Sequence, residues 1–155
     1  MRWDAARGGL RMAHFRLGKL SCRMSADQEK SPPPRSVGRT HRDLIAWQAG
    51  MQLLVEAYRV ARQLPDVERY GLASQLRRAS VSIAANIAEG FGRYSRKDFV
   101  RHLSIATGAL REMETHLEAI TLLEYLPEAS VATAERAARR TAFLLRRLQR
   151  SLSSE

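Results

Sequence analysis

Beyond residue 40, apolar side chains recur at alternating spacings of three and four residues, which is the period of one face of a helix. The first stripe is Leu44, Trp47, Met51, Leu54, Tyr58 and Ala61. The second is Leu72, Leu76, Ile83 and Ile87, with small residues between them. The third is Phe99, Leu103, Ala106, Leu110, Met113, Leu117 and Ile120. The fourth is Val131, Ala134, Ala138, Thr141, Leu145, Leu148 and Leu152.

These stripes predict four helices, at about residues 43–64, 70–91, 96–125 and 128–151. Two capping-box patterns, Thr40 to Asp43 and Ser95 to Asp98, mark the starts of the first and third helices. Pro65 and Pro127 follow helix ends, because a proline cannot continue a helix. Short connections make successive helices antiparallel, so residues 40–152 are predicted to form an all-α, antiparallel up-down four-helix bundle.

Several apolar residues fall outside the four stripes, and they bear on assembly. They are Leu53, Val55, Val60, Val100, Ile105, Leu122, Leu123, Phe143 and Leu144. A helix that is apolar on more than one face usually buries the second face as well. This favours a homo-oligomer, and the alternative is that these residues widen the core of a monomer.

Residues 1–39 form a basic tail with no sustained apolar period, and we expect it to be disordered or loosely ordered. The run of three prolines at 32–34 is typical of an extended linker. The composition loosely resembles an organellar transit peptide, but translation starting at Met24 is the preferred interpretation.

Charge distinguishes this chain more than any motif does. Its 155 residues carry 26 Lys and Arg against 16 Asp and Glu, a net charge of +10. Residues 1–40 contribute +6, from nine basic and three acidic groups. A basic surface attracts polyanions, and nucleic acid is the leading candidate inside a cell. Codon bias is a competing explanation, because almost all the basic groups are arginine.

No motif for catalysis, a cofactor or a metal site is present. The single cysteine, Cys22, lies in the tail, and Glu112 and His116 form one i, i+4 pair, interpreted as a solvated helix pair. No phosphate-binding loop, nucleophile elbow or paired zinc-binding histidines occurs. We therefore expect no enzyme activity, no cofactor and no metal. No apolar run approaches the ~20 residues of a membrane span, so a cytoplasmic protein without membrane contact is expected.

Two clusters of basic residues are the candidate nucleic-acid-binding sites. One surrounds the second helix connection: Arg93, Arg96, Lys97 and Arg101. The other runs along the last helix: Arg136, Arg139, Arg140, Arg146, Arg147 and Arg150. The start of the third helix also offers backbone N–H groups to an anion. Because no aromatic partners were identified beside the arginines, recognition of the phosphate backbone is expected. The alternative role for an arginine-rich face is solubility.

Asn86 and Glu89 are polar residues within an apolar, small-residue run of the second helix. A polar group there needs a partner, which Arg77, Arg78 or Arg93 could provide, from this chain or from a neighbouring copy. We interpret this group as a polar device that fixes register and subunit arrangement, in preference to an RNA contact.

The same segment resembles a family signature. The residues that carry the resemblance are Tyr70 to Arg78, Ser82-Ile83, Asn86 to Gly90, Gly92-Arg93, and also Asp43-Leu44, Trp47-Gln48 and Glu112 to Thr115. Over about residues 41–150 the chain resembles the small bacterial four-helix-bundle proteins first noticed as reading frames inside intervening sequences of large-subunit (23S) ribosomal RNA genes.

The resemblance implies a ring-like homopentamer and no established enzyme activity. It also implies a distant kinship with the accessory variability protein of diversity-generating retroelements, which is a basic pentamer that works with a reverse transcriptase and its RNA. The functional prediction is a non-catalytic, homo-oligomeric bundle that binds RNA or DNA. The alternative is an accessory subunit that binds another protein, for example a retroelement reverse transcriptase.

Overall fold

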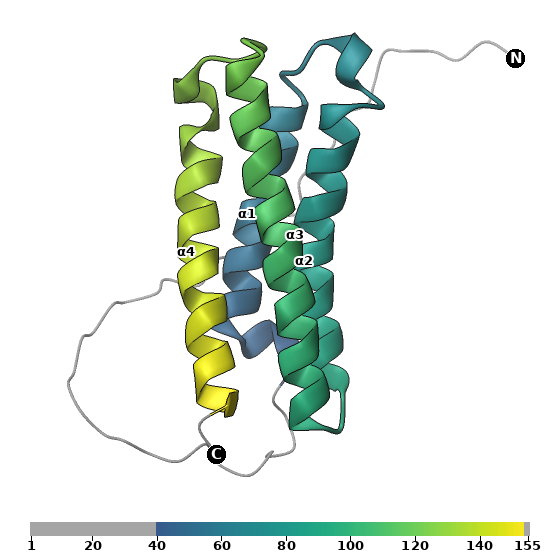
Figure 1. Cartoon of the computed structure of the whole chain (residues 1–155), viewed down its shortest axis with the longest axis vertical. Helices are drawn as coiled ribbons and strands as arrows, with labels where there is room; N and C mark the ends of the chain where they lie inside the picture. Colours follow the sequence, from purple (N-terminus) through teal and green to yellow (C-terminus); the bar gives the residue numbers. More distant parts are fainter. Residues whose placement is uncertain (1–39, 154–155) are drawn as a thin grey trace, which may run out of the picture. The chain divides into compact units, whose positions relative to one another are not determined.

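The computed structural model describes residues 40–153, and these residues form four long helices and no strand. The helices are α1 (Ile45–Ala61), α2 (Leu72–Gly92), α3 (Arg96–Leu122) and α4 (Glu128–Ser153). Successive helices run in opposite directions, and both α1 and α3 pack against α2 and α4 (Figure 1). The described part is the predicted all-α, antiparallel up-down four-helix bundle. The predicted tail, 1–39, lies outside the described residues.

The first capping box forms, but it caps a short turn and not α1. Asp43 accepts a hydrogen bond from the Thr40 backbone N at 2.8 Å, and Thr40 Oγ1 accepts one from the Arg42 backbone N at 3.2 Å. The element between them is the 3-10 turn η1 (His41–Asp43). Leu44 is extended, so α1 starts at Ile45, two residues after the predicted start.

Glu68 ties three elements together at one end of the bundle. It closes the 3-10 turn η2 (Asp66–Glu68), and its Oε2 accepts a hydrogen bond from the backbone N of Leu72, the first residue of α2. Its Oε1 accepts a hydrogen bond from the hydroxyl of Tyr125 in the α3–α4 connection, at 2.9 Å. This bond, with burial and the charge of Glu68, raises the pKa of Tyr125 above its ordinary value. A Cβ at Gly71 would collide with the Glu68 carboxylate, so a larger residue there would displace the side chain that accepts the Leu72 N–H.

The third helix ends at Leu122, three residues before its predicted end, in a Schellman arrangement. The Tyr125 backbone N donates to the Ile120 carbonyl at 3.1 Å, and the Glu124 backbone N donates to the Thr121 carbonyl at 3.0 Å. Glu124 adopts a φ of 58°, the left-handed conformation that glycine usually supplies at this position.

The predicted apolar stripes of α3 and α4 face the core. Every residue of the α3 stripe is buried, as are the first five of the α4 stripe. The predicted stripe of α1 is only partly correct. Its last residue, Ala61, is buried, and Leu44 and Trp47 pack against the core, but the other buried positions are Ala46, Ala49, Gly50, Leu53, Ala57 and Val60. Met51 is exposed, and Trp47 and Tyr58 lie half-buried on the flank. Small alanines pack against the other helices here. Because the prediction followed the larger apolar side chains, most of the predicted stripe lies one residue away from the buried positions.

The α2–α3 pair makes a close helix contact at Gly90. A Cβ on this residue would lie 2.7 Å from both the Cβ of His102 and the Cδ2 of Phe99. Gly90 is itself buried, and Phe99 stacks edge-on against Phe91. The glycine therefore sets how closely the first turns of α3 approach the last turns of α2.

Candidate nucleic-acid interface

The C-terminal part of the predicted α4 cluster lies at the same end of the bundle as the α2–α3 cluster, although 45 positions separate Arg101 from Arg146 in the sequence. The α2–α3 connection and the last turns of α4 both lie at the lower end in Figure 1, opposite the α3–α4 connection. Arg146, Arg147 and Arg150 are therefore brought to the end that also carries Lys97 and Arg101. Arg136, Arg139 and Arg140 continue the row along α4 toward the other end.

Within the α2–α3 cluster, Arg93 has a structural role. It forms an ion pair with Glu89, and its Nε donates to the Nε2 of His102 at 3.3 Å. Arg96, Lys97 and Arg101 are exposed. No carboxylate of the described residues lies within 4.0 Å of Lys97 or Arg101. These two cations are available to a ligand.

The start of α3 is already occupied by an acidic residue of the chain. Ser95 Oγ accepts a hydrogen bond from the Asp98 backbone N at 3.2 Å, and Asp98 places a carboxylate in the first turn. A negative side chain there occupies the favourable field of the helix N-terminus. The anion contact predicted at these N–H groups therefore competes with Asp98.

The arginines of α4 differ in their partners. Arg136 donates to Thr133 Oγ1 at 2.9 Å, and Arg139 lies 3.6 Å from Glu135. In the described part of the chain, Arg140, Arg146 and Arg147 have no carboxylate within 4.0 Å. The uncompensated positive charge of this helix is therefore concentrated toward its C-terminal half.

The arginine row of α4 has an aromatic partner, contrary to the prediction from sequence. Phe143 is 59% exposed and lines an open hollow with Arg146, Arg147 and Arg150. Successive residues of a helix are about 100° apart, which places Phe143 between the row of Arg139 and Arg146 and the row of Arg140 and Arg147. The sequence already contained this neighbourhood, because Phe143 lies three or four residues from the arginines on either side of it.

The polar group of α2 finds a partner that the sequence analysis missed. Asn86 Oδ1 lies 3.3 Å from Nδ1 of His102, and Asn86 Nδ2 donates to the Ser82 carbonyl at 2.8 Å. Glu89 is half-exposed and pairs with Arg93, one of the three partners suggested. Asn86 and His102 are both eight residues from Tyr94, the middle of the α2–α3 connection, so an antiparallel hairpin brings them together.

The other two suggested partners point elsewhere. Arg77 donates from Nη2 to the Arg69 carbonyl at 3.1 Å, and Arg78 is exposed. Both line a groove between α1 and α2 together with Tyr58, Ser74, Val81 and Ser82. Within one chain, neither arginine is a partner of the Asn86 and Glu89 group.

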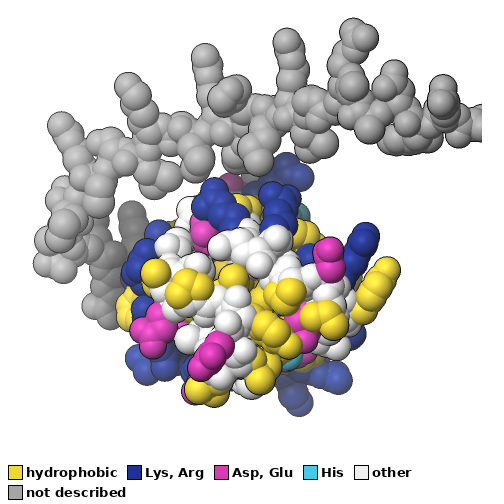
Figure 2. Space-filling view, turned by 90° about the horizontal axis from the view of Figure 1, so that it is seen from above, with side chains coloured by type: hydrophobic (Ala, Val, Ile, Leu, Met, Phe, Trp, Pro, Cys, Tyr) yellow, Lys and Arg dark blue, Asp and Glu magenta, His cyan; other side chains and the backbone are white. Residues whose placement is uncertain are grey.

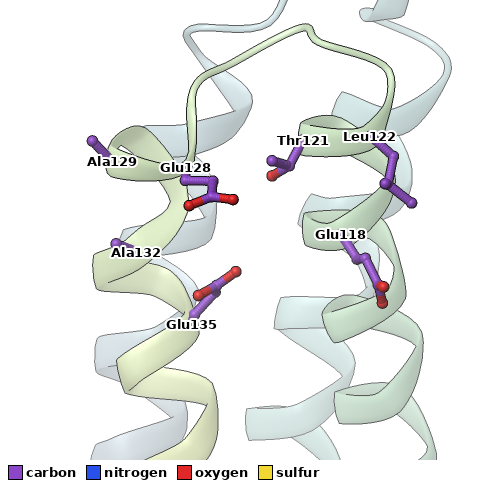
Figure 3. A pocket seen from close by; sticks show the side chains of 7 residues that line it. All are labelled: Glu118, Thr121, Leu122, Glu128, Ala129, Ala132 and Glu135. Carbon is purple, nitrogen blue, oxygen red and sulfur yellow. The ribbon is translucent and has the colours of Figure 1, made fainter.

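The opposite end of the bundle is acidic and apolar. An open hollow of about 610 Å³ between α3 and α4 is lined by Glu118, Thr121, Leu122, Glu128, Ala129, Ala132 and Glu135. Glu128 and Glu135 turn toward α3 (Figure 3). Seen from this end, hydrophobic side chains gather on the surface with carboxylates among them and Lys and Arg at the rim (Figure 2). A polyanion is repelled from these glutamates, so the two ends of the bundle differ in the ligands they favour.

Residues 40–153 hold no group of three or more His, Cys, Asp or Glu side chains placed to bind a metal ion. The Glu112 and His116 pair forms, with Glu112 Oε1 lying 3.6 Å from His116 Nε2. That nitrogen is buried and makes no hydrogen bond with any described residue, whereas the Glu112 side chain is half-exposed, so only the glutamate of the pair is solvated as predicted. The same residues contain no helix long and apolar enough to cross a bilayer.

Fold and surface together define a small antiparallel helical-bundle protein with one cationic end. The chain belongs to the 23S rRNA-intervening sequence protein family, whose profile matches residues 42–147. The match covers most of the bundle, including both basic clusters except Arg150.

One similar solved structure is a Bacteroides thetaiotaomicron protein of unknown function from the S23 ribosomal protein family, determined at 1.70 Å resolution. It is 24% identical to this chain, with a TM-score of 0.63, and the alignment covers 68% of this chain and 98% of that one. This likeness shows the fold alone. No curated protein matched the chain.

Proposed function

We propose that this chain is a non-catalytic, cytoplasmic, homo-oligomeric bundle that binds RNA or another nucleic acid through its arginine-rich surfaces. The observation that carries the proposal is the set of uncompensated cations on α3 and α4. Arg140, Arg146 and Arg147, with Lys97 and Arg101, lack a carboxylate neighbour among the described residues. Polyanion binding is favoured where fixed positive charge is concentrated and is not already neutralised by the protein.

Arginines elsewhere on the bundle provide the contrast. Arg59 forms an ion pair with Glu56 at 2.6 Å, and Arg111 forms one with Glu114 at 2.6 Å. Both pairs join residues three apart on one helix, the usual way to neutralise charge on a solvated face. If the arginines of α4 served solubility alone, they could be paired with carboxylates in the same way. Between residues 129 and 153, however, Glu135 is the only carboxylate, so most of these arginines have no such partner.

Charge reversal tests the proposal. The double variant Arg146→Glu/Arg147→Glu is expected to weaken binding of an RNA oligonucleotide by about tenfold or more. The slope of log affinity against log salt is expected to fall by about 1 to 2, because each lost phosphate contact removes roughly 0.7 to 0.9. Fluorescence anisotropy across a salt series measures both quantities.

The matched control is Arg59→Glu/Arg111→Glu, which changes the net charge equally but alters arginines already paired with glutamate. Both variants keep the basic tail, so its contribution is the same in each. A larger loss for the α4 variant supports the proposal. Equal losses, or no binding by the wild-type chain at low salt, contradict it.

Assembly is the second part of the proposal. Leu53 and Val60 are buried in the monomer core, but Leu122 and Leu123 of the off-stripe set remain exposed. Val67 and Tyr70 are exposed at the same end. Apolar groups of this kind favour contact with another chain, and the family resemblance supports five copies. Native mass spectrometry is expected to show a homopentamer, and a monomer at micromolar concentration would contradict the assembly.

The alternative function is that of an accessory subunit that binds another protein, such as a retroelement reverse transcriptase. The exposed apolar end, with its glutamate-lined hollow, is the observation that favours it. A partner that stays bound after nuclease treatment, and that Leu122→Glu releases, would support this alternative over nucleic-acid binding.

A further inference from the structure

Phe143 is a large aromatic side chain exposed in the middle of a cationic helix face. It is 59% exposed, whereas the apolar residues of the predicted α4 stripe are buried or pack against the core. With Arg146, Arg147 and Arg150 it lines an open hollow of about 460 Å³. An exposed phenylalanine adds nothing to solubility, and between two arginine rows it offers a ligand an apolar face beside positive charge.

Unpaired bases of a nucleic acid have this combination of properties. Each base presents a flat face that stacks on an aromatic ring, and its flanking phosphates bind arginine. The bases of a duplex are already stacked on one another, so their faces are closed to such a side chain. Arg146 and Arg147 lie three and four residues after Phe143, one turn along the same helix face, so a strand that stacks on the ring has cations beside its next phosphates.

We propose that the hollow of Phe143, Arg146, Arg147 and Arg150 binds single-stranded nucleic acid by stacking an unpaired base on the Phe143 ring. This inference rests on the proposed function. It adds that the ligand is single-stranded and that Phe143 is the residue that distinguishes a single strand from a duplex. The ring recognises a base of any sequence, because every base has a stacking face. The arginines hold the backbone and carry the salt dependence.

The test compares four probes of one length with the full chain: single-stranded RNA, single-stranded DNA, the RNA duplex, and a single strand with abasic sites throughout. The wild-type chain is expected to bind both single strands more tightly than the duplex and about tenfold more tightly than the abasic strand. Phe143→Ala is expected to lose this preference while the salt slope stays unchanged. Phe143→Trp is expected to restore it, because tryptophan also stacks.

Different results would contradict this inference and the proposed function. If Phe143→Ala binds single-stranded and abasic probes with the wild-type ratio, stacking on Phe143 is overturned, while charge-dependent binding still stands. If Phe143→Ala changes the subunit number in native mass spectrometry, the residue belongs to an assembly contact and the inference also fails. If no probe binds the wild-type chain at low salt, the proposed function itself fails.

Discussion

Individual side chains take their roles from neighbours that are distant in the sequence. His102 contacts Asn86 across the α2–α3 connection, and Tyr125 contacts Glu68 across 57 positions. Neither partner is marked by a motif, because a single hydrogen bond between two helices leaves no periodic pattern. Glu124 is a third case: its left-handed φ of 58° follows from where α3 ends.

Glu124→Gly is expected to stabilise the bundle. The left-handed conformation costs a side-chain-bearing residue about 1–2 kcal/mol, and glycine's extra freedom in the unfolded chain cancels about 0.5–1 kcal/mol of that gain. The net rise in the free energy of unfolding is about 0.5–1 kcal/mol, measured by urea denaturation at fixed protein concentration. Glu124→Ala removes the same carboxylate without relieving the backbone, so it is the control and is expected to give no gain.

At the scale of the helix, the sequence predicted where each helix starts and ends better than which face of it is buried. The starts and ends of the four helices were predicted to within three residues, because caps, prolines and apolar stripes act locally. The inward faces of α3 and α4 were also predicted, because their large apolar residues point to the core. In α1 the buried positions are mainly alanines such as Ala49 and Ala57, which carry little hydrophobic signal beside Trp47 and Met51. Packing against α2 and α4 decided that face.

Gly90→Ala tests the close contact between α2 and α3. Its Cβ would lie 2.7 Å from both His102 and Phe99, and Phe99 is buried, so the helices must shift apart. The expected loss is about 1–3 kcal/mol in the free energy of unfolding, as for other overpacked cores. Gly108→Ala in α3 meets no atom within 4 Å and is expected to gain about 0.5–1 kcal/mol. Loss of stability in both variants, or in neither, would contradict this account of Gly90.

At the scale of the whole bundle, the fold brings together charged residues that are far apart in the sequence. Arg93 to Arg101 and Arg136 to Arg150 were predicted as two separate clusters. The antiparallel arrangement puts the first cluster and the C-terminal part of the second at one end (Figure 1). Glu118, Glu128 and Glu135 gather near the other end (Figure 3). The net charge could be counted from the sequence. The separation of basic and acidic residues to opposite ends could not, because it depends on the directions of the helices. One end is therefore suited to a polyanion and the other to an apolar or cationic surface.

The most direct measurement is photo-crosslinking of the full chain to a single-stranded RNA that carries 4-thiouridine, followed by peptide mass spectrometry. The account predicts crosslinks at the C-terminal half of α4, with Phe143 among the modified residues, and at the α2–α3 connection. Crosslinks confined to the end that carries Glu118, Glu128 and Glu135, or to residues 1–39, would contradict it.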